Sequence, residues 1–256
     1  MYDTRSLPDP YQGDWTGFMS NYVNAENPVP EDSASIARAR RAYCALVTQI
    51  DYELNRLFIA LGDLGLWDDL VILFVSDHGD MLYDHGLVRK SVPFEGSTGI
   101  PLFLHLPCSL RQGRAGITDG RTAELRDVFP TLCDVCGIDI PDGLDGQSLL
   151  DTSFTREYLH GEHTNGILSN HWLTDGKEKY CWFSQSGKEL LFDLHADPCE
   201  MHDLSRERPD RTGFWRKRLT GELSGRIEGY VQNGVLRIGR TPLSSQPWAG
   251  IGKGKA

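Results

Sequence analysis

The chain of 256 residues is 39% hydrophobic and has a formal net charge of −10, with a pI near 5.2. This composition is typical of a globular protein, and the acidic balance argues against nucleic acid or an anionic membrane as a partner, because both attract clustered Lys and Arg. No apolar run approaches the roughly 18 residues that span a bilayer, and no secretory apolar core follows Met1. The default expectation is therefore a soluble, cytoplasmic chain without a signal peptide.

The first predicted element is a long amphipathic helix after an irregular opening at residues 1–32. It begins near Ser33 or Ser35 and ends at Gly62 or Gly65, and its apolar stripe is expected to cover a sheet. The stripe comprises Tyr43, Leu46, Val47, Ile50, Leu54, Leu57, Phe58 and Leu61.

An uninterrupted apolar run at residues 70–75 predicts a central strand, covered on both faces, in a parallel sheet. Asp77 and His78 follow it directly, and a polar loop at 80–91 leads to a second apolar strand at 100–106. Open α/β sheets bind ligands at the carboxyl edges of their strands. The sequence therefore places a carboxylate and an imidazole where a metal or an ester would bind.

The remaining pattern divides the chain near residue 150. Before that point, a helix is predicted from Asp127 to Gly137. After it, short apolar runs at 171–174, 179–184 and 189–194, separated by tight turns, predict an antiparallel meander, and a polar helix is expected within 205–230. The predicted fold is α/β: a mixed sheet flanked by helices over 1–150, a smaller antiparallel sheet with a helix over 151–238, and an unstructured tail over 239–256.

Asp77 and His78 are the strongest candidates for chemistry, because carboxylate and neutral imidazole are both ligands of divalent cations. The alternative is an Asp that caps a turn and a His in a surface loop. Lys90 could hold the anionic part of an ester and stabilise charge on a leaving oxygen, or it could simply be solvated. His85 could act as an acid or order the loop.

A second candidate group is the run from His160 to His163, which contains two histidines and Glu162. Its spacing is similar to that of metal ligands, but no helix is predicted that would place both imidazoles on one face. A ligand role and a substrate-facing role both stay open.

The segment from Val75 to Lys90 resembles the sulfatases of the alkaline phosphatase superfamily. It is similar in particular to bacterial arylsulfatases and choline sulfatases, and to the related phosphonate monoester hydrolases. The resemblance covers nearly the whole chain to about residue 205. It continues in Pro93–Ser97, Asp127–Asp134, Asp145–Leu149 and Leu191–Glu200.

This resemblance implies an alkaline-phosphatase-like fold and a hydrolase with one divalent cation, calcium or manganese. Asp77 and His78 match two of the family's metal ligands, and Lys90 matches the lysine that contacts the sulfate and the leaving oxygen. The family's nucleophile is a formylglycine made from Cys or Ser in a C/S-x-P/A-x-R motif, and no Cys or Ser in this chain precedes an Arg by four positions. The resemblance therefore implies that Met1 lies about midway through a family member.

Three interpretations follow from these observations. The chain is the C-terminal part of a sulfatase that cleaves small-molecule sulfate esters, with the N-terminal half as its partner; or it is a non-catalytic fragment or partner subunit; or it belongs to a phosphonate or phosphate ester hydrolase. The chain alone is expected to be inactive, because the nucleophile and half of the ligands are missing, and poorly soluble, because strand edges and an apolar face would be open.

Overall fold

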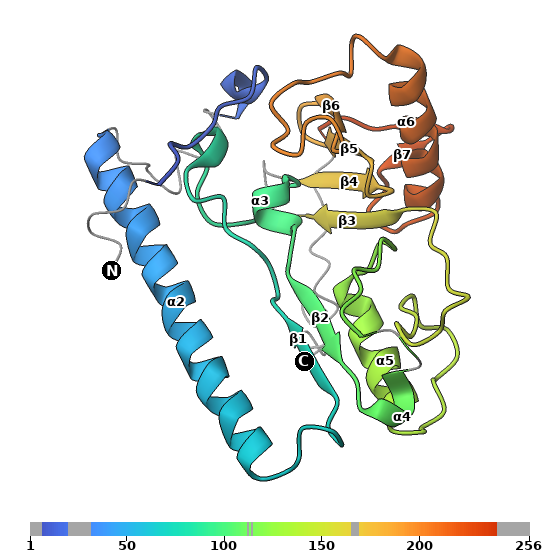
Figure 1. Cartoon of the computed structure of the whole chain (residues 1–256). Coiled ribbons are helices and arrows are strands. Elements are labelled where there is room, and N and C mark those ends of the chain that lie inside the picture. The colour runs from blue at the N-terminus through green and yellow to red at the C-terminus, as the bar shows by residue number, and fades with distance from the viewer. Residues whose placement is uncertain (1–6, 20–31, 112, 114, 165–168, 240–256) are drawn as a thin grey trace, which may run out of the picture.

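The computed structural model describes residues 7–19, 32–111, 113, 115–164 and 169–239. Within these ranges no helix is long and apolar enough to cross a membrane. Most of the predicted tail, residues 240–256, lies outside the described part. Figure 1 shows a long helix beside a pair of strands, and a larger sheet backed by a second helix.

The long helix α2 extends over Ser33–Asp63, as predicted, and the carboxylate of Asp32 accepts a hydrogen bond from the backbone N–H of Ser35 at 2.7 Å. The expectation that its apolar stripe covers a sheet is wrong for most of the stripe. Leu54, Phe58 and Leu61 are half-buried, but no residue of α2 is buried. Five members of the stripe are exposed: Tyr43, Leu46, Val47, Ile50 and Leu57.

The predicted strand after the helix is β1, Ile72–Val75, and the second is β2, Leu102–His105. The expected parallel setting is wrong for this pair, because β1 and β2 are antiparallel, with Ile72 opposite His105. An apolar run does not reveal the direction of its neighbour, and the side chains of β1 are only half-buried. Figure 1 shows α2 on one side of the two strands and α5, Val128–Val135, on the other.

Several short helices connect these elements. At one of them Asp127 does not cap α5 with its side chain, contrary to the prediction. Asp127 ends η3, Leu125–Asp127, and its buried carboxylate binds Arg156 Nη2 at 2.6 Å instead of capping α5. The other short helices are η1 (Thr16–Phe18), η2 (Asp84–Gly86), α3 (Glu95–Thr98) and α4 (Cys108–Arg111).

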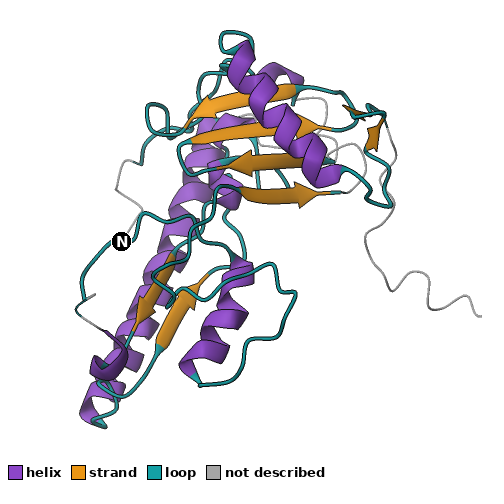
Figure 2. Cartoon of the chain, turned by 90° about the vertical axis from the view of Figure 1, so that its right-hand side faces the viewer, coloured by secondary structure: helices purple, strands orange, loops and turns teal. Residues whose placement is uncertain are grey.

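The predicted meander is confirmed as part of a four-stranded antiparallel sheet with the order β3-β4-β5-β6. The edge strand β3, Leu159–His163, was not predicted, and the polar helix is α6, Pro209–Leu223. Figure 2 shows α6 lying across one face of this sheet. The remaining strands are β4 (Asn170–Thr174), β5 (Glu178–Phe183), β6 (Glu189–Asp193), β7 (Val231–Gln232) and β8 (Val235–Leu236).

The two faces of the four-stranded sheet belong to two separate hydrophobic clusters. One face packs with Trp15, Met81 and Phe94, so the loops around β1 share a core with the sheet. The other face packs with α6 through Trp215 and Leu219. Because strand side chains alternate between the two faces of a sheet, neighbouring residues of one strand pack into different clusters.

A buried ion cluster also ties the sheet to the first part of the chain. Lys179 of β5 is fully buried and contacts Glu95 at 2.6 Å and Glu200 at 3.0 Å. Burial lowers the pKa of Lys179, but the carboxylates of Glu200 and Glu95 outweigh this and the pKa is raised, so the lysine stays charged. Replacing Lys179 would leave the buried Glu200 without its counter-charge, and such a loss typically costs about 3–5 kcal/mol.

Candidate functional site

Asp77 and His78 leave the end of β1 in a turn held by backbone contacts. The His78 ring forms a hydrogen bond with the carbonyl oxygen of Gly79 through Nδ1 at 2.7 Å, and Gly79 N donates to Ser97 O at 2.9 Å. A Cβ on Gly79 would lie 2.2 Å from the carbonyl oxygen of Gly96. Gly79 is therefore required for close backbone approach to the start of α3.

The loop at 80–91 returns Lys90 to this turn. Asp80 Oδ1 accepts hydrogen bonds from the backbone N–H groups of Leu82 and Arg89, at 2.9 and 3.2 Å, which closes the loop at its base. Five non-glycine residues of the loop have positive φ, a conformation that persists only where contacts enforce it: Leu82, Tyr83, His85, Arg89 and Ser91.

Asp77, His78 and Lys90 are brought together, as the sequence predicts. Lys90 Nζ lies 2.6 Å from His78 Nε2, and Asp77 Oδ2 lies 3.3 Å from the same nitrogen. A neutral His78 that donates from Nδ1 to Gly79 O carries a lone pair on Nε2. The Lys90 ammonium donates to that lone pair in this structure.

These residues line a cavity of about 730 Å³ between the turn and the four-stranded sheet. His163 and Trp172 border the same cavity from β3 and β4, and the Trp172 ring covers Gly161, where a Cβ would meet it at 2.0 Å. Burial lowers the pKa of His163, so its imidazole is neutral near pH 7. His163 is the histidine of this motif that faces the turn side of the sheet and borders the cavity, and the substrate-facing role stays a prediction.

The donor set at the turn fits part of a divalent-cation site. The hydrogen bond between His78 Nδ1 and Gly79 O fixes the orientation of the ring, as hydrogen bonds from the non-ligating nitrogen do for histidines that bind metals. Asp77 is largely exposed, with 82% of its side-chain surface accessible, so its carboxylate can turn into the cavity. Two ligands are fewer than the six to eight oxygen ligands typical of Ca²⁺, so Asp77 and His78 account for one side of such a site.

His85 orders the loop, as one of its two predicted roles required. Its Nδ1 accepts a hydrogen bond from Gly13 N at 3.1 Å, and its Nε2 donates to Cys199 O at 3.0 Å. Only 3% of the residue is exposed, and burial lowers its pKa to about 4. His85 therefore joins three distant segments as a neutral imidazole.

The structure splits the run from His160 to His163 between the two faces of the sheet. His160 and Glu162 face the α6 side, where His171 of β4 joins them; His163 faces the other side. No pattern in the sequence singles out His171, because its position depends on the register between two strands.

The comparisons with known proteins agree with this arrangement. A family model described as Sulfatase matches residues 8–138, which is just over half of the chain. The chain belongs to the sulfatase family.

Individual relatives support the same assignment. An arylsulfatase of Clostridium perfringens is 41% identical over 254 residues, which cover 93% of this chain and 52% of the relative. A choline-sulfatase of Rhizobium meliloti is 35% identical over 189 residues, covering 67% of this chain and 34% of the relative. The chain thus spans about half, or less, of the length of these curated relatives.

The crystal structure of a phosphonate monoester hydrolase of Agrobacterium radiobacter superposes with a TM-score of 0.66 and 28% identity. The superposition covers 74% of this chain and 42% of that one. The predicted α/β class is confirmed, together with its likeness to part of an alkaline-phosphatase-like fold. The predicted subdivision near residue 150 stays a prediction.

Proposed function

We propose that this chain forms one wall of the active site of a cation-dependent sulfatase that hydrolyses small-molecule sulfate monoesters. The observation that carries the proposal is the cluster of Asp77, His78 and Lys90, which lies at a strand end and borders one cavity. A carboxylate, a ligand-ready imidazole and an ammonium group in one cavity suit a divalent cation together with the singly charged anion of a sulfate monoester.

Each residue has a separate role in this proposal. Asp77 and His78 would hold a calcium or manganese ion, which supplies charge that polarises the sulfate oxygens. Lys90 would give up its hydrogen bond to His78 Nε2, since that lone pair cannot serve two partners. Its ammonium would then donate to the sulfate and to the leaving oxygen, which gains negative charge as the S–O bond breaks.

In this proposal the nucleophile comes from a segment other than residues 1–256, because these residues contain no C/S-x-P/A-x-R motif. We therefore propose that catalysis needs a further segment that carries the nucleophile and the remaining ligands. A phosphonate or phosphate ester hydrolase is the second candidate, and it is favoured by the likeness to the phosphonate monoester hydrolase.

The test uses this chain extended by the in-frame coding sequence upstream of Met1. Sulfate, phosphate and phosphonate esters of 4-nitrophenol are supplied with Ca²⁺ or Mn²⁺. Lys90→Ala should lower kcat/KM for the preferred ester about 10²–10³-fold, the range found for loss of one charge-stabilising donor. Lys217→Ala, which changes an exposed lysine of α6, is the matched control and should have no effect.

Each outcome separates the candidates. Preference for the sulfate ester supports the sulfatase, whereas preference for a phosphonate or phosphate supports the second candidate. Full activity of Lys90→Ala would contradict the role of Lys90. An upstream frame that closes at once would favour a non-catalytic fragment or partner subunit.

A further inference from the structure

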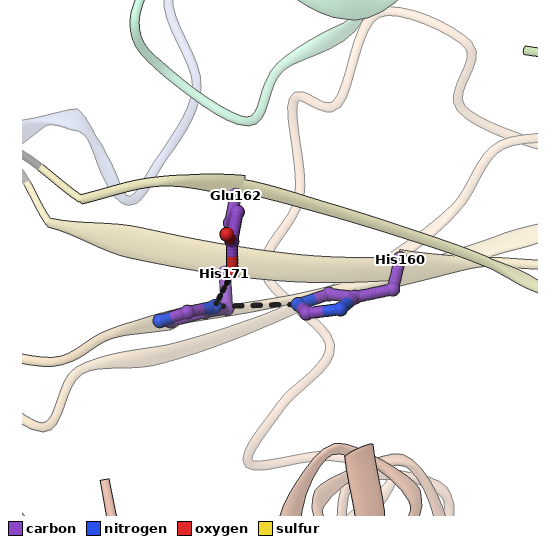
Figure 3. A group of neighbouring side chains, drawn as sticks. All are labelled: His160, Glu162 and His171. Atoms are coloured by element: carbon purple, nitrogen blue, oxygen red, sulfur yellow. Dashed lines mark hydrogen bonds and ion pairs between the residues drawn. The ribbon is translucent and has the colours of Figure 1, made fainter. Parts of the chain in front are cut away.

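A second group of metal-ligating side chains lies on the α6 side of the four-stranded sheet, and Figure 3 shows how its three members converge. His160 and Glu162 are two positions apart on β3 and therefore share a face. His171 is the cross-strand partner of Glu162 on β4. The antiparallel register thus brings together three residues that span two strands.

The distances between the donor atoms suit a tetrahedral zinc site. His160 Nε2 lies 3.2 Å from His171 Nδ1, and His171 Nδ1 lies 3.4 Å from Glu162 Oε2. Zinc bonds of about 2.0–2.1 Å place tetrahedral ligands roughly 3.3–3.4 Å apart. Two of the three pairs already have this spacing, and the three ligand atoms all lie within 4.8 Å of one another.

Hydrogen bonds do not satisfy every donor and acceptor atom of these three side chains. His171 Nδ1 contacts both neighbours, but it can form only one of the two hydrogen bonds. It either accepts one from His160 or donates one to Glu162. On the far side of the ring, His171 Nε2 is buried and has no hydrogen-bond partner in the described part of the chain, so neither tautomer of His171 is fully satisfied. A divalent cation would accept all three converging lone pairs at once.

The surroundings also suit a cation. His171 is fully buried, but the side chain of Glu162 is 32% exposed, which gives access from solvent. Arg226 holds the Glu162 carboxylate at 2.7 Å and is itself bound by Glu228 at 2.6 Å. These two carboxylates and one guanidinium have a net charge of −1, and an anchored ligand carboxylate is typical of metal sites.

We propose that His160, Glu162 and His171 bind one zinc ion, through two imidazole nitrogens and one carboxylate oxygen, with the fourth position open to water. The ion would join the edge strand β3 to β4 and, through Arg226, to the segment before β7. This site is distinct from the cation proposed at Asp77 and His78 and does not depend on the proposed function.

The experiment measures zinc binding to the whole 256-residue chain carrying His78→Ala, which weakens the other cation site. The protein is stripped with chelator and dialysed against ZnCl₂, and bound zinc is counted by mass spectrometry. Co²⁺ is also added, because its visible spectrum reports tetrahedral ligands. We expect one zinc per chain, a rise in Tm and a tetrahedral cobalt spectrum.

Three variants and one control locate the ion. His160→Gln should lose the bound zinc and the cobalt spectrum, and Glu162→Gln is a second ligand variant in case the first fails to fold, as checked by circular dichroism. Arg226→Gln should weaken zinc binding about 10-fold, the lower end of the effect of removing a hydrogen-bond partner that orients a metal ligand. His163→Gln, on the same strand but facing the other side, should bind zinc normally.

Two results would overturn the proposal. One is the absence of stoichiometric zinc in the His78→Ala chain. The other is zinc that remains bound in folded His160→Gln and Glu162→Gln chains, which would place the ion elsewhere.

Discussion

At the scale of single residues, His85 shows how burial sets a pH dependence. Its folded-state pKa of about 4 lies below the usual 6.5. Between these pH values His85 is therefore protonated in the unfolded chain but neutral in the folded chain. The contribution of His85 is fully favourable above pH 6.5 and declines as the pH falls toward 4. The expected loss is about 3 kcal/mol of unfolding free energy, from about 1.4 kcal/mol per pKa unit.

Urea unfolding at several pH values between 7 and 4 checks this expectation. His85→Gln should be less stable than the original chain at pH 7 but should lose less stability on acidification. His202→Gln is the control, because 71% of the side chain of His202 is exposed. Parallel pH profiles of the original chain and His85→Gln would show that the imidazole is not held neutral by folding.

At the scale of elements, the apolar stripe of α2 has two environments along its length. Near its C-terminal end it includes the half-buried Phe58 and Leu61, whereas its middle includes Val47 and Ile50, which are 53% and 54% exposed. A stripe of exposed apolar residues this long favours aggregation unless something covers it. The chain spans only part of the length of its relatives. The remaining part of a longer sulfatase would therefore be available to cover the exposed part of this stripe.

The double substitution Val47→Lys and Ile50→Glu tests this difference between the two parts of the stripe. In the 256-residue chain it should change the unfolding free energy by less than about 0.5 kcal/mol, because both side chains are solvated, and it should reduce light scattering by aggregates. Leu61→Lys, in the half-buried part of the stripe, should destabilise the chain. A large loss of stability in the double variant would mean that the exposed part of the stripe packs within this chain.

At the scale of the whole molecule, the proposed function requires groups that these 256 residues do not supply. The 256-residue chain alone should not hydrolyse 4-nitrophenyl sulfate, whereas the chain extended upstream should, and chelation with EDTA should abolish that activity. The reason is that the proposal places the nucleophile and most cation ligands in a further segment. Turnover by the isolated chain that is lost in Lys90→Ala would contradict this expectation.

Sequence patterns predicted the features of the fold and the site that follow from local periodicity or from a recognisable motif. The limits of α2, the meander and the site around Asp77 follow from spacing or resemblance, and the structure brings Lys90 to His78 as expected. The antiparallel pairing of β1 and the position of His171 depend on strand direction and register, which a single sequence does not encode locally.

The buried Lys179 has a mechanical consequence for the proposed active site. It holds Glu95, the first residue of α3, and the next residue, Gly96, presses its carbonyl oxygen against Gly79. A continuous line of rigid contacts thus runs from the middle of the sheet to the turn that carries Asp77 and His78. The larger sheet thereby supports the backbone turn that carries these two side chains, although it supplies neither of them.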